Sequence, residues 1–259
     1  DLQPGDTVIV PSFTFVTTAL AFAREGARIL FCDIEPRTLG LDPAHLSTLL
    51  DDSVRAVVPI HYAGVACELE PIRAALTDWP RASLIEDNAH GLFGRWRGKP
   101  LGSFGRFATL SFHETKNIVC GEGGALLVHE QRDVERARVL FDKGTNRRAF
   151  FLGQVDKYSW RDSGSSFGLS DILAGYRTIF ERIDASLRPA FVRNGTRSFT
   201  RSLRTFADRN PPSRRIRSSR GRRCWRASNV VRTRRCPEVL PRHNCCQITR
   251  PETNATAHW

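Results

Sequence analysis

The sequence predicts an α/β fold for residues 1–186, with a mostly parallel sheet that is covered by helices on both faces. Two observations lead to this prediction. Short runs of β-branched and aromatic residues alternate along the chain with longer runs of helical periodicity. The β-type runs are apolar at nearly every position, as in TVIVP (7–11) and VRAVVPIH (54–61), so both of their faces are expected to be buried. Such strands require a layer of helices on each side of the sheet.

Residues with strong positional preferences mark the helix boundaries. Gly26 ends an apolar helical run, because glycine readily takes the left-handed conformation found just after helices. Asp42 and Pro43 open another helix, since aspartate can cap the first N–H groups and proline suits the first helical position. The predicted elements are, in order, strand 7–11, helix 15–26, strand 27–34, helix 41–50, strand 54–61, helix 68–79, strand 82–88, strands 107–112 and 124–130, and helices 131–144 and 169–184.

The last two predicted strands differ from the others in how they are connected. FATLSF (107–112) and GALLVHE (124–130) are separated by a short segment that ends in a glycine-rich turn, GEGG (121–124). A parallel pair needs a crossover of about a dozen residues or more, which is usually a helix. No long helix is predicted here, so we expect part of the sheet to be antiparallel or connected as a hairpin.

The distribution of charge divides the chain at residue 186. Residues 1–186 contain 21 Lys and Arg against 24 Asp and Glu, whereas residues 187–259 contain 18 Arg, no Lys and three acids. The second segment has no sustained period and is rich in Arg, Ser, Pro and Cys. We interpret it as a tail that is disordered or out of frame, since a reading-frame slip in GC-rich DNA produces this composition. The alternative is a basic arm that binds nucleic acid.

The start of the chain and its cysteines indicate whether the sequence is a fragment and which cellular compartment suits it. The chain has no Met and opens directly on a turn and a strand, so we expect a fragment that lacks its true N-terminus. It contains no signal-peptide pattern and no apolar run long enough to cross a membrane. The seven Cys form no CxxC pair and no Cys/His metal spacing. We therefore expect no metal site, and free thiols in a reducing cytoplasm.

Chemically distinctive side chains gather where the predicted strands end. In an open α/β sheet, ligands bind at the carboxyl ends of the strands. Four strand-end segments are the ones to consider, residues 11–15, 61–64, 87–90 and 111–116, and three of them hold the candidate site residues Phe15, Asp87, His90, Ser111 and Lys116. Each of these also has an ordinary structural interpretation, such as a turn cap for Asp87 or a core position for Phe15. Their shared position at one edge of the sheet favours a site.

Lys116 is the most informative of these residues. It is one of four lysines in a chain with 35 arginines, and it lies between an apolar strand and a glycine-rich turn. Arg stays charged, whereas a Lys whose pKa is lowered can act as a nucleophile and form a Schiff base. A lysine and a carboxylate such as Asp87 are the minimum for pyridoxal phosphate, because the amine holds the aldehyde and the carboxylate keeps the ring nitrogen protonated. Such a site also needs an aromatic ring for stacking, and hydroxyl or backbone N–H groups for the phosphate.

Several longer motifs are specific enough to indicate a family. PSFTFVTTALAFAREGA, IEDNAHGLFG, SFHETKN, GEGGALLV, DKGTNR and QVDKYSWRDSGSSF occur in this order. Together they resemble the DegT/DnrJ/EryC1/StrS family of sugar aminotransferases, and within it the dTDP-4-amino-4,6-dideoxygalactose transaminases of cell-envelope glycan synthesis. The resemblance runs from residue 1 to about residue 186. It implies the large domain of the fold type I pyridoxal phosphate-dependent transferases, here incomplete.

The resemblance implies a role for each candidate residue. Lys116 would hold the cofactor's aldehyde as a Schiff base and move the proton, and Asp87 would pair with the pyridinium nitrogen. His90 falls where the family has Gln or His beside the cofactor's phenolic oxygen. Phe15 would lie over the cofactor ring, and the hydroxyl of Ser111 would bind its phosphate.

The resemblance also implies substrates and partners. The reaction would be ping-pong, with L-glutamate as amino donor and a dTDP-4-keto-6-deoxy sugar as acceptor. The intact protein would be a homodimer, in which Asn146 reaches the phosphate of the neighbouring subunit's cofactor. The family's N-terminal Gly-Thr/Ser turn and its C-terminal small domain have no counterpart in this sequence, so we expect an inactive fragment. The alternatives are a nucleic-acid-binding protein built on the tail, and a gene remnant without function.

Overall fold

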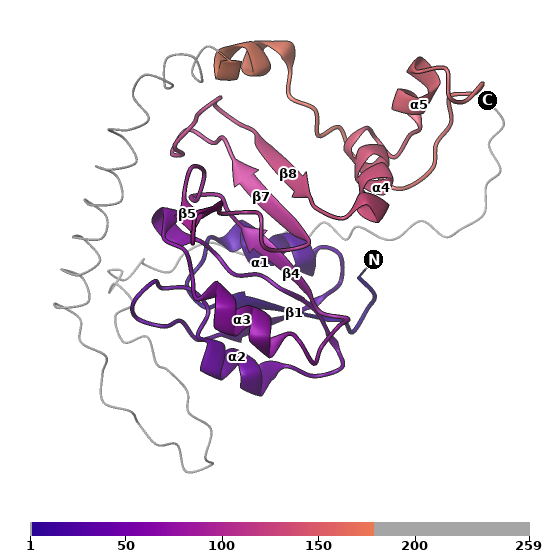
Figure 1. Ribbon diagram of the computed structural model, residues 1–259. Coiled ribbons are helices and arrows are strands. Elements are labelled where there is room, and N and C mark those ends of the chain that lie inside the picture. The colour runs from indigo at the N-terminus through magenta and orange to yellow at the C-terminus, as the bar shows by residue number, and fades with distance from the viewer. Residues whose placement is uncertain (1, 179–259) are drawn as a thin grey trace, which may run out of the picture. The chain divides into compact units, whose positions relative to one another are not determined.

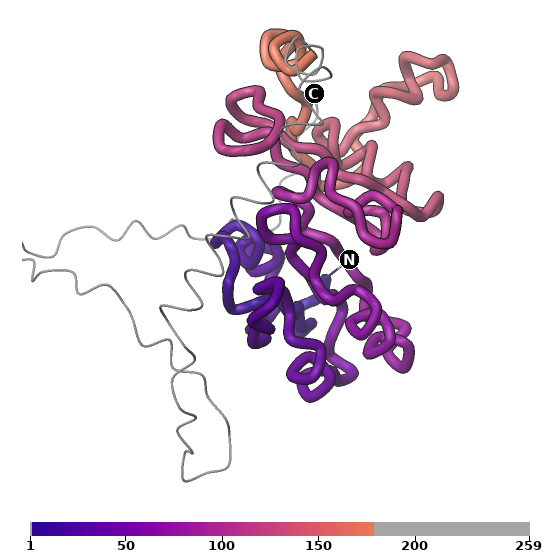
Figure 2. Tube along the Cα trace, turned by 60° about the vertical axis from the view of Figure 1, so that its left-hand side comes forward, coloured from indigo at the N-terminus to yellow at the C-terminus, as the bar shows by residue number. Residues whose placement is uncertain are grey.

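The computed structural model describes residues 2–178 of the 259-residue chain. The predicted boundary at residue 186, the Arg-rich segment 187–259 and the end of the predicted helix 169–184 lie outside the described residues, while residues 171–178 are helical. The path of the chain can be followed by colour in Figure 1 and, from a second direction, in Figure 2. Within residues 2–178, no helix is both long enough and apolar enough to cross a membrane.

Six strands form one sheet in the order β2-β1-β3-β4-β7-β8. β1 pairs in parallel with both β2 and β3, and the β3–β4 and β4–β7 pairs are parallel as well. β8 runs antiparallel to β7. The mostly parallel sheet and its antiparallel last pair confirm the prediction. The strands are β1 Thr7–Pro11, β2 Arg28–Cys32, β3 Val54–Val57, β4 Ser83–Asp87, β7 Phe107–Ser111 and β8 Gly124–Val128.

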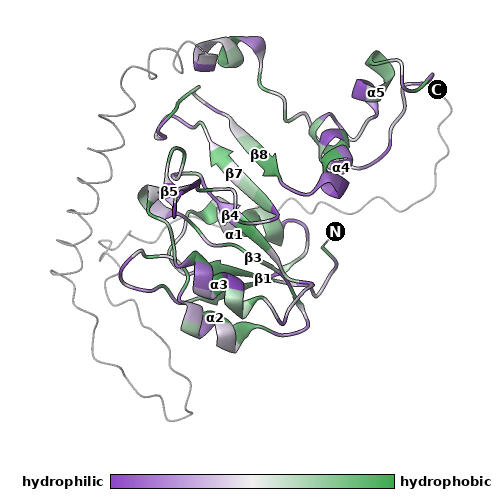
Figure 3. Cartoon of the chain, viewed as in Figure 1, coloured by the Kyte–Doolittle hydropathy of each residue, from purple (hydrophilic) through white to green (hydrophobic). Residues whose placement is uncertain are grey.

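Helices cover both faces of the sheet, as predicted (Figure 1). Side chains alternate across β1, so that Val8 joins the apolar cluster that includes Phe22 of α1, whereas Ile9 joins the cluster that includes Leu46 of α2 and Ile72 of α3. The hydrophobic colour in Figure 3 lies mainly along the strands, and hydrophilic colour marks much of α3 and α4. The helices are α1 Val16–Ala23, α2 Pro43–Leu49, α3 Leu69–Ala75, α4 Gln131–Phe141 and α5 Arg147–Phe151.

α2 begins at the residues that the sequence indicated. The Asp42 carboxylate accepts hydrogen bonds from the N–H groups of Ala44, at 2.9 Å, and His45, at 3.4 Å. Pro43 occupies the first helical position, where its missing N–H leaves no intrahelical bond unmade. A cap of this kind stabilises a helix by about 1 kcal/mol.

β3 ends earlier than predicted, at Val57. Pro59 explains this difference, because proline has no N–H to donate to a neighbouring strand. The chain nevertheless continues beside β4, since Ile60 and Asp87 form a single parallel bridge. The segment after β3 is therefore held against the end of β4.

A short antiparallel hairpin was absent from the sequence prediction. It consists of β5 (Arg95–Trp96) and β6 (Lys99–Pro100). Its turn residues, Arg97 and Gly98, have φ angles of 46° and 79°, and a type I′ turn requires positive φ at both positions. Strands of two residues show no alternation of hydrophobicity, so no sequence pattern reveals them. The five-residue helix α5 was also not predicted.

Candidate active site

The carboxyl ends of four parallel strands meet at one edge of the sheet. β1, β3, β4 and β7 run in the same direction, so the segments that follow them share this edge. Asp87 is the last residue of β4, His90 lies in the loop after it, and Lys116 lies in the loop between β7 and β8. The charge of Lys116 acts on His90, and the charge of Asp87 acts on both. The structure therefore brings together three of the residues that the sequence singled out.

Lys116 is a half-buried amine on a tethered loop. Its backbone N–H donates to the His113 carbonyl at 2.9 Å. The side-chain amide of Asn117 donates to the carbonyls of His90, at 3.4 Å, and Leu92, at 3.3 Å, which ties this loop to the loop after β4. Burial lowers the pKa of the Lys116 ammonium, and the negative charge of Asp87 partly opposes this shift. A larger fraction of this amine is therefore neutral and nucleophilic near pH 7 than in an exposed lysine.

Asp87 is held by contacts to its backbone and to both of its carboxylate oxygens. Its N–H donates to the Pro59 carbonyl at 2.9 Å, and its carbonyl accepts from the His61 N–H at 3.1 Å. Oδ1 accepts from the Ala89 N–H at 3.1 Å, and Oδ2 accepts from the Thr18 hydroxyl at 2.7 Å. The position and orientation of the carboxylate are thus set by three different segments of the chain.

His90 is held as a neutral imidazole with a defined tautomer. Its Nδ1 accepts a hydrogen bond from the Ala63 N–H at 3.2 Å, so its proton is on Nε2, which is a donor. Burial lowers the pKa of His90, the nearby Lys116 charge lowers it further, and Asp87 opposes both effects. Ala63 has a φ of 53°, a left-handed conformation that is uncommon for a residue other than glycine. Strain of this kind often accompanies a functional site.

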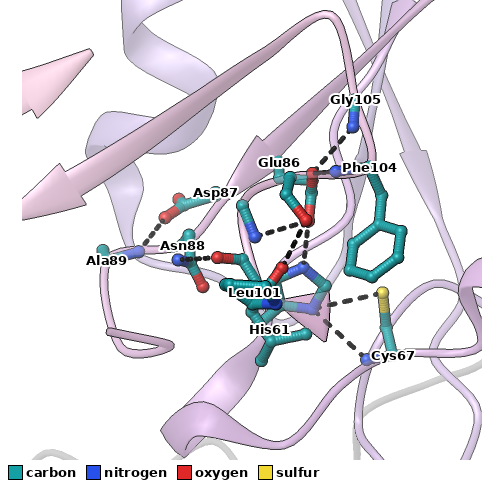
Figure 4. A network of polar contacts seen from close by, with 12 residues as sticks. His61, Cys67, Glu86, Asp87, Asn88, Ala89, Leu101, Phe104 and Gly105 are labelled. Carbon is teal, nitrogen blue, oxygen red and sulfur yellow. Dashed lines mark hydrogen bonds and ion pairs between the residues drawn. The ribbon is translucent and has the colours of Figure 1, made fainter. Parts of the chain in front are cut away.

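A buried polar network lies under the end of β4 (Figure 4). The fully buried Glu86 carboxylate accepts from His61 Nε2 at 2.8 Å and from the backbone N–H groups of Gly102, Phe104 and Gly105 at 2.8, 2.6 and 2.7 Å. Burial alone would raise the pKa of Glu86, but the hydrogen bonds from His61 and from the backbone N–H groups outweigh it and lower the pKa. This ionised carboxylate fixes the loop before β7 to the strand that carries the site aspartate.

His61 and Glu86 have a structural role that sequence reasoning missed. The Cys67 N–H donates to His61 Nδ1 at 3.4 Å, so the proton of the neutral ring is on Nε2 and points to Glu86. The Cys67 sulfur lies 3.6 Å from the same nitrogen, which gives a Cys–His–Glu row. All three side chains are buried, and burial raises the pKa of the Cys67 thiol well above its ordinary value. The thiol is therefore unreactive, and these three side chains stabilise the fold.

For the other three predicted residues, which lie within the described residues 2–178, the structure gives no polar contact with Lys116, Asp87 or His90. Phe15 precedes α1, and its side chain is 73% exposed, so it is free to cover a ligand at this edge. Ser111 ends β7 and is half-buried, and its hydroxyl accepts from the His113 N–H at 3.4 Å. Asn146 is buried elsewhere, where its amide donates to the Lys157 carbonyl at 3.0 Å and accepts from the Ser159 N–H at 2.7 Å. Its predicted contact with a cofactor phosphate stays a prediction.

The residues at this edge fit the chemistry of pyridoxal phosphate. That cofactor needs an amine that condenses with its aldehyde and an anion beside its ring nitrogen. Lys116 supplies an amine whose pKa is lowered, and Asp87 supplies a carboxylate whose charge reaches that amine. His90 adds an N–H donor at Nε2 and lies near enough to both groups to feel their charges.

Comparisons with known proteins agree with this chemistry. The sequence profile of the DegT/DnrJ/EryC1/StrS aminotransferase family, whose members use pyridoxal phosphate, matches residues 1–185. GDP-perosamine synthase of Caulobacter vibrioides is 33% identical over 188 residues, which are 72% of this chain and 48% of that protein. The spore coat polysaccharide biosynthesis protein SpsC of Bacillus subtilis is 34% identical over 149 residues, which are 58% of this chain and 38% of that protein.

Solved structures show the same relationship. The crystal structure of 3-amino-5-hydroxybenzoic acid synthase superposes with a TM-score of 0.63 and 29% identity, over 68% of this chain and 45% of that one. This chain thus spans about half or less of the length of the curated relatives it matches. The family profile covers most of the chain and contains all the predicted site residues. The chain therefore belongs to the DegT/DnrJ/EryC1/StrS aminotransferase family.

Proposed function

We propose that residues 1–186 are part of the cofactor-binding domain of a sugar-nucleotide aminotransferase. The reaction would transfer an amino group from L-glutamate to C4 of a nucleotide-linked 4-keto-6-deoxy sugar, with dTDP-4-amino-4,6-dideoxygalactose as the product. The single observation that carries the proposal is the meeting of Lys116, Asp87 and His90 at the carboxyl edge of the sheet, where β4 and β7 are parallel neighbours and Asn117 ties the Lys116 loop to the His90 loop. Sugar-nucleotide amination of this kind serves the synthesis of cell-envelope polysaccharides.

Lys116 and Asp87 would have the central roles. When bound, pyridoxal phosphate supplies a ring that withdraws electrons from the substrate carbon. Lys116 would hold the cofactor's aldehyde and then move the proton at the substrate carbon, which requires the lowered pKa of its ammonium group. Asp87 would face the ring nitrogen, and the contacts to both carboxylate oxygens would keep it in place.

Three further residues would bind the cofactor around this centre. His90 would donate from Nε2 to the phenolic oxygen, because its Nδ1 is already occupied by the Ala63 N–H. Phe15, with its exposed ring beside α1, would cover the cofactor ring. The Ser111 hydroxyl would contact the phosphate.

We also propose that the intact protein is a cytoplasmic homodimer. The aromatic side chains of Phe151, Tyr158 and Trp160 are 71%, 48% and 78% exposed, and apolar surface of this kind favours association with another protein surface. Asn146 holds the loop that carries Tyr158 and Trp160, through its contacts with residues 157 and 159. In a dimer this loop and Asn146 would approach the neighbouring subunit's cofactor phosphate.

Cofactor capture by Lys116 is the direct test of this proposal. We expect the chain to develop a visible absorption band on addition of pyridoxal phosphate, and borohydride to remove the band and leave a cofactor adduct on Lys116. Lys116→Ala should form no band, whereas Lys99→Ala, the same change at an exposed lysine of β6, should behave as the unsubstituted chain does. A band of equal strength in Lys116→Ala would overturn the assignment.

Substrate choice needs a second measurement. With L-glutamate as donor, amino transfer to dTDP-linked and GDP-linked 4-keto-6-deoxy sugars can be followed by mass spectrometry of the sugar nucleotide. For the intact protein we expect the dTDP sugar to accept the amino group and the C4 configuration of the product to be that of galactose. Transfer to the GDP sugar alone would overturn the proposed nucleotide and leave the aminotransferase activity standing. Cofactor capture without transfer to either sugar would indicate the inactive fragment expected from the sequence.

A further inference from the structure

Thr18 carries a buried hydroxyl on α1, the helix that follows β1 at the carboxyl edge of the sheet. It lies in the first turns of α1 and is 9% exposed, and it is the buried residue of this helix. A buried position on a helix that faces a sheet is ordinarily apolar, because burial of a hydroxyl costs free energy unless the group is hydrogen-bonded. The Thr18 hydroxyl therefore needs a hydrogen-bond partner, and that partner is Asp87.

The Thr18 hydroxyl donates to Asp87 Oδ2 at 2.7 Å, which joins α1 to the end of β4. The Thr14 hydroxyl donates to the Thr18 oxygen at 2.9 Å. A hydroxyl has a single proton, so Thr18 accepts from Thr14 and directs its own proton to the carboxylate. The chain of two hydroxyl groups thus ends on an oxygen of Asp87.

The second oxygen of Asp87 is held by a donor from a different segment. Oδ1 accepts from the Ala89 N–H at 3.1 Å, which is a contact within the turn that follows β4. One donor alone would allow the carboxylate to rotate about its last torsion, since that torsion is broad in aspartate. Two donors, one on each oxygen and from different segments, fix the plane of the carboxylate.

We infer that Thr18 is a positioning residue that fixes the Asp87 carboxylate in the orientation needed to face the ring nitrogen of pyridoxal phosphate. This inference rests on the proposed function, and it assigns to the helix residue an effect that acts through Asp87. A hydrogen bond to a charged group is stronger than one between neutral groups, and an aspartate that rotates away would bind the ring less well. Loss of the hydroxyl should therefore weaken cofactor binding and change the orientation of the bound ring.

Three substitutions on α1 separate this role from a contribution to packing. Thr18→Val keeps the branched shape and removes the hydroxyl, and Thr18→Ser keeps the hydroxyl. Thr17→Val is the matched control, because Thr17 is the adjacent residue of the same helix and is exposed. Each variant of the full chain would be titrated with pyridoxal phosphate, followed by the visible absorption and the visible circular dichroism of the bound cofactor. Thermal unfolding without cofactor would be measured in parallel.

We expect Thr18→Val to raise the cofactor dissociation constant about tenfold and to reduce the visible circular dichroism per bound cofactor. Thr18→Ser should keep most of the cofactor affinity and most of the visible circular dichroism. Thr17→Val should match the unsubstituted chain in both measurements. An unchanged affinity and dichroism in Thr18→Val would overturn the positioning role, as would a loss that Thr18→Ser does not restore. The absence of a visible band in the unsubstituted chain would instead contradict the proposed function, and this inference with it.

Discussion

His61 Nε2 lies 2.8 Å from Glu86 Oε2, and both side chains are completely buried. The pair connects the segment after β3 with β4, and three backbone N–H groups of the loop before β7 complete the coordination of the carboxylate. Glu86 immediately precedes Asp87, and the two side chains point to opposite faces of the sheet. The network on one face thus anchors the strand end whose other face carries the candidate site.

Replacement of Glu86 by Gln should strongly destabilise the fold. The carboxylate accepts from four donors, whereas an amide places its own NH2 against some of them and leaves buried N–H groups unpaired. We expect the free energy of unfolding to fall by about 3 kcal/mol, measured by urea denaturation. Glu70→Gln is the matched control at an exposed residue paired with Arg97, and it should change stability by less than about 1 kcal/mol. Equal effects of the two substitutions would contradict the proposed contribution of the Glu86 network to the free energy of unfolding.

The same carboxylate should make stability depend on pH in a defined window. The pKa of Glu86 is lower in the folded chain than in the unfolded chain, where an ordinary glutamate titrates near about 4.3. Its stabilising contribution is therefore complete above that value and is lost as the pH falls through the folded pKa. We expect the difference in unfolding free energy between the unsubstituted chain and Glu86→Gln to be constant from about pH 7 to about pH 5. It should shrink at lower pH, and a difference that grows on acidification would contradict the assignment.

Asp87→Asn should lower the pKa of Lys116 further, although it removes a residue of the site. Burial lowers the pKa of the Lys116 ammonium, and the Asp87 charge is what opposes that shift. Without the carboxylate, the neutral amine persists to lower pH. The rate at which trinitrobenzenesulfonate labels Lys116 would be measured by peptide mass spectrometry across a pH series without cofactor. We expect the curve of this rate against pH to shift to lower pH. Asp78→Asn, at an exposed aspartate, should leave the labelling curve in place, and a curve that moves upward in Asp87→Asn would refute the coupling.

The sequence predicted those parts of the molecule that local patterns determine. Asp42 and Pro43 marked the start of α2, because a cap depends only on neighbouring residues. The approach of Lys116 to Asp87 followed from the fact that parallel strands place their carboxyl ends at the same edge. Both predictions needed no knowledge of side-chain packing.

The missed features depend on contacts between distant segments. Glu86 stands in the charged stretch IEDN and has no local sign of burial, since its partners are His61 and backbone groups of a loop beyond the next hairpin. Thr18 resembles any threonine of a helix, and only the packing of α1 against β4 shows that it contacts Asp87. The hairpin of β5 and β6 was missed for another reason, because its strands are too short for a hydrophobic period.

His90 offers a test of the tautomer that the structure assigns. Because the Ala63 N–H occupies Nδ1, the proton of the neutral ring is on Nε2, and we expect this N–H to contact the bound cofactor. His90→Gln retains an N–H donor at a similar reach and should keep the affinity for pyridoxal phosphate within about threefold, whereas His90→Leu, with no donor, should lose about tenfold. Affinity would be measured by titration of the visible band, with thermal unfolding of the cofactor-free chain as the check on folding. Equal losses in both variants, with unchanged unfolding, would show that the ring contributes through its shape and that its Nε2–H is not used.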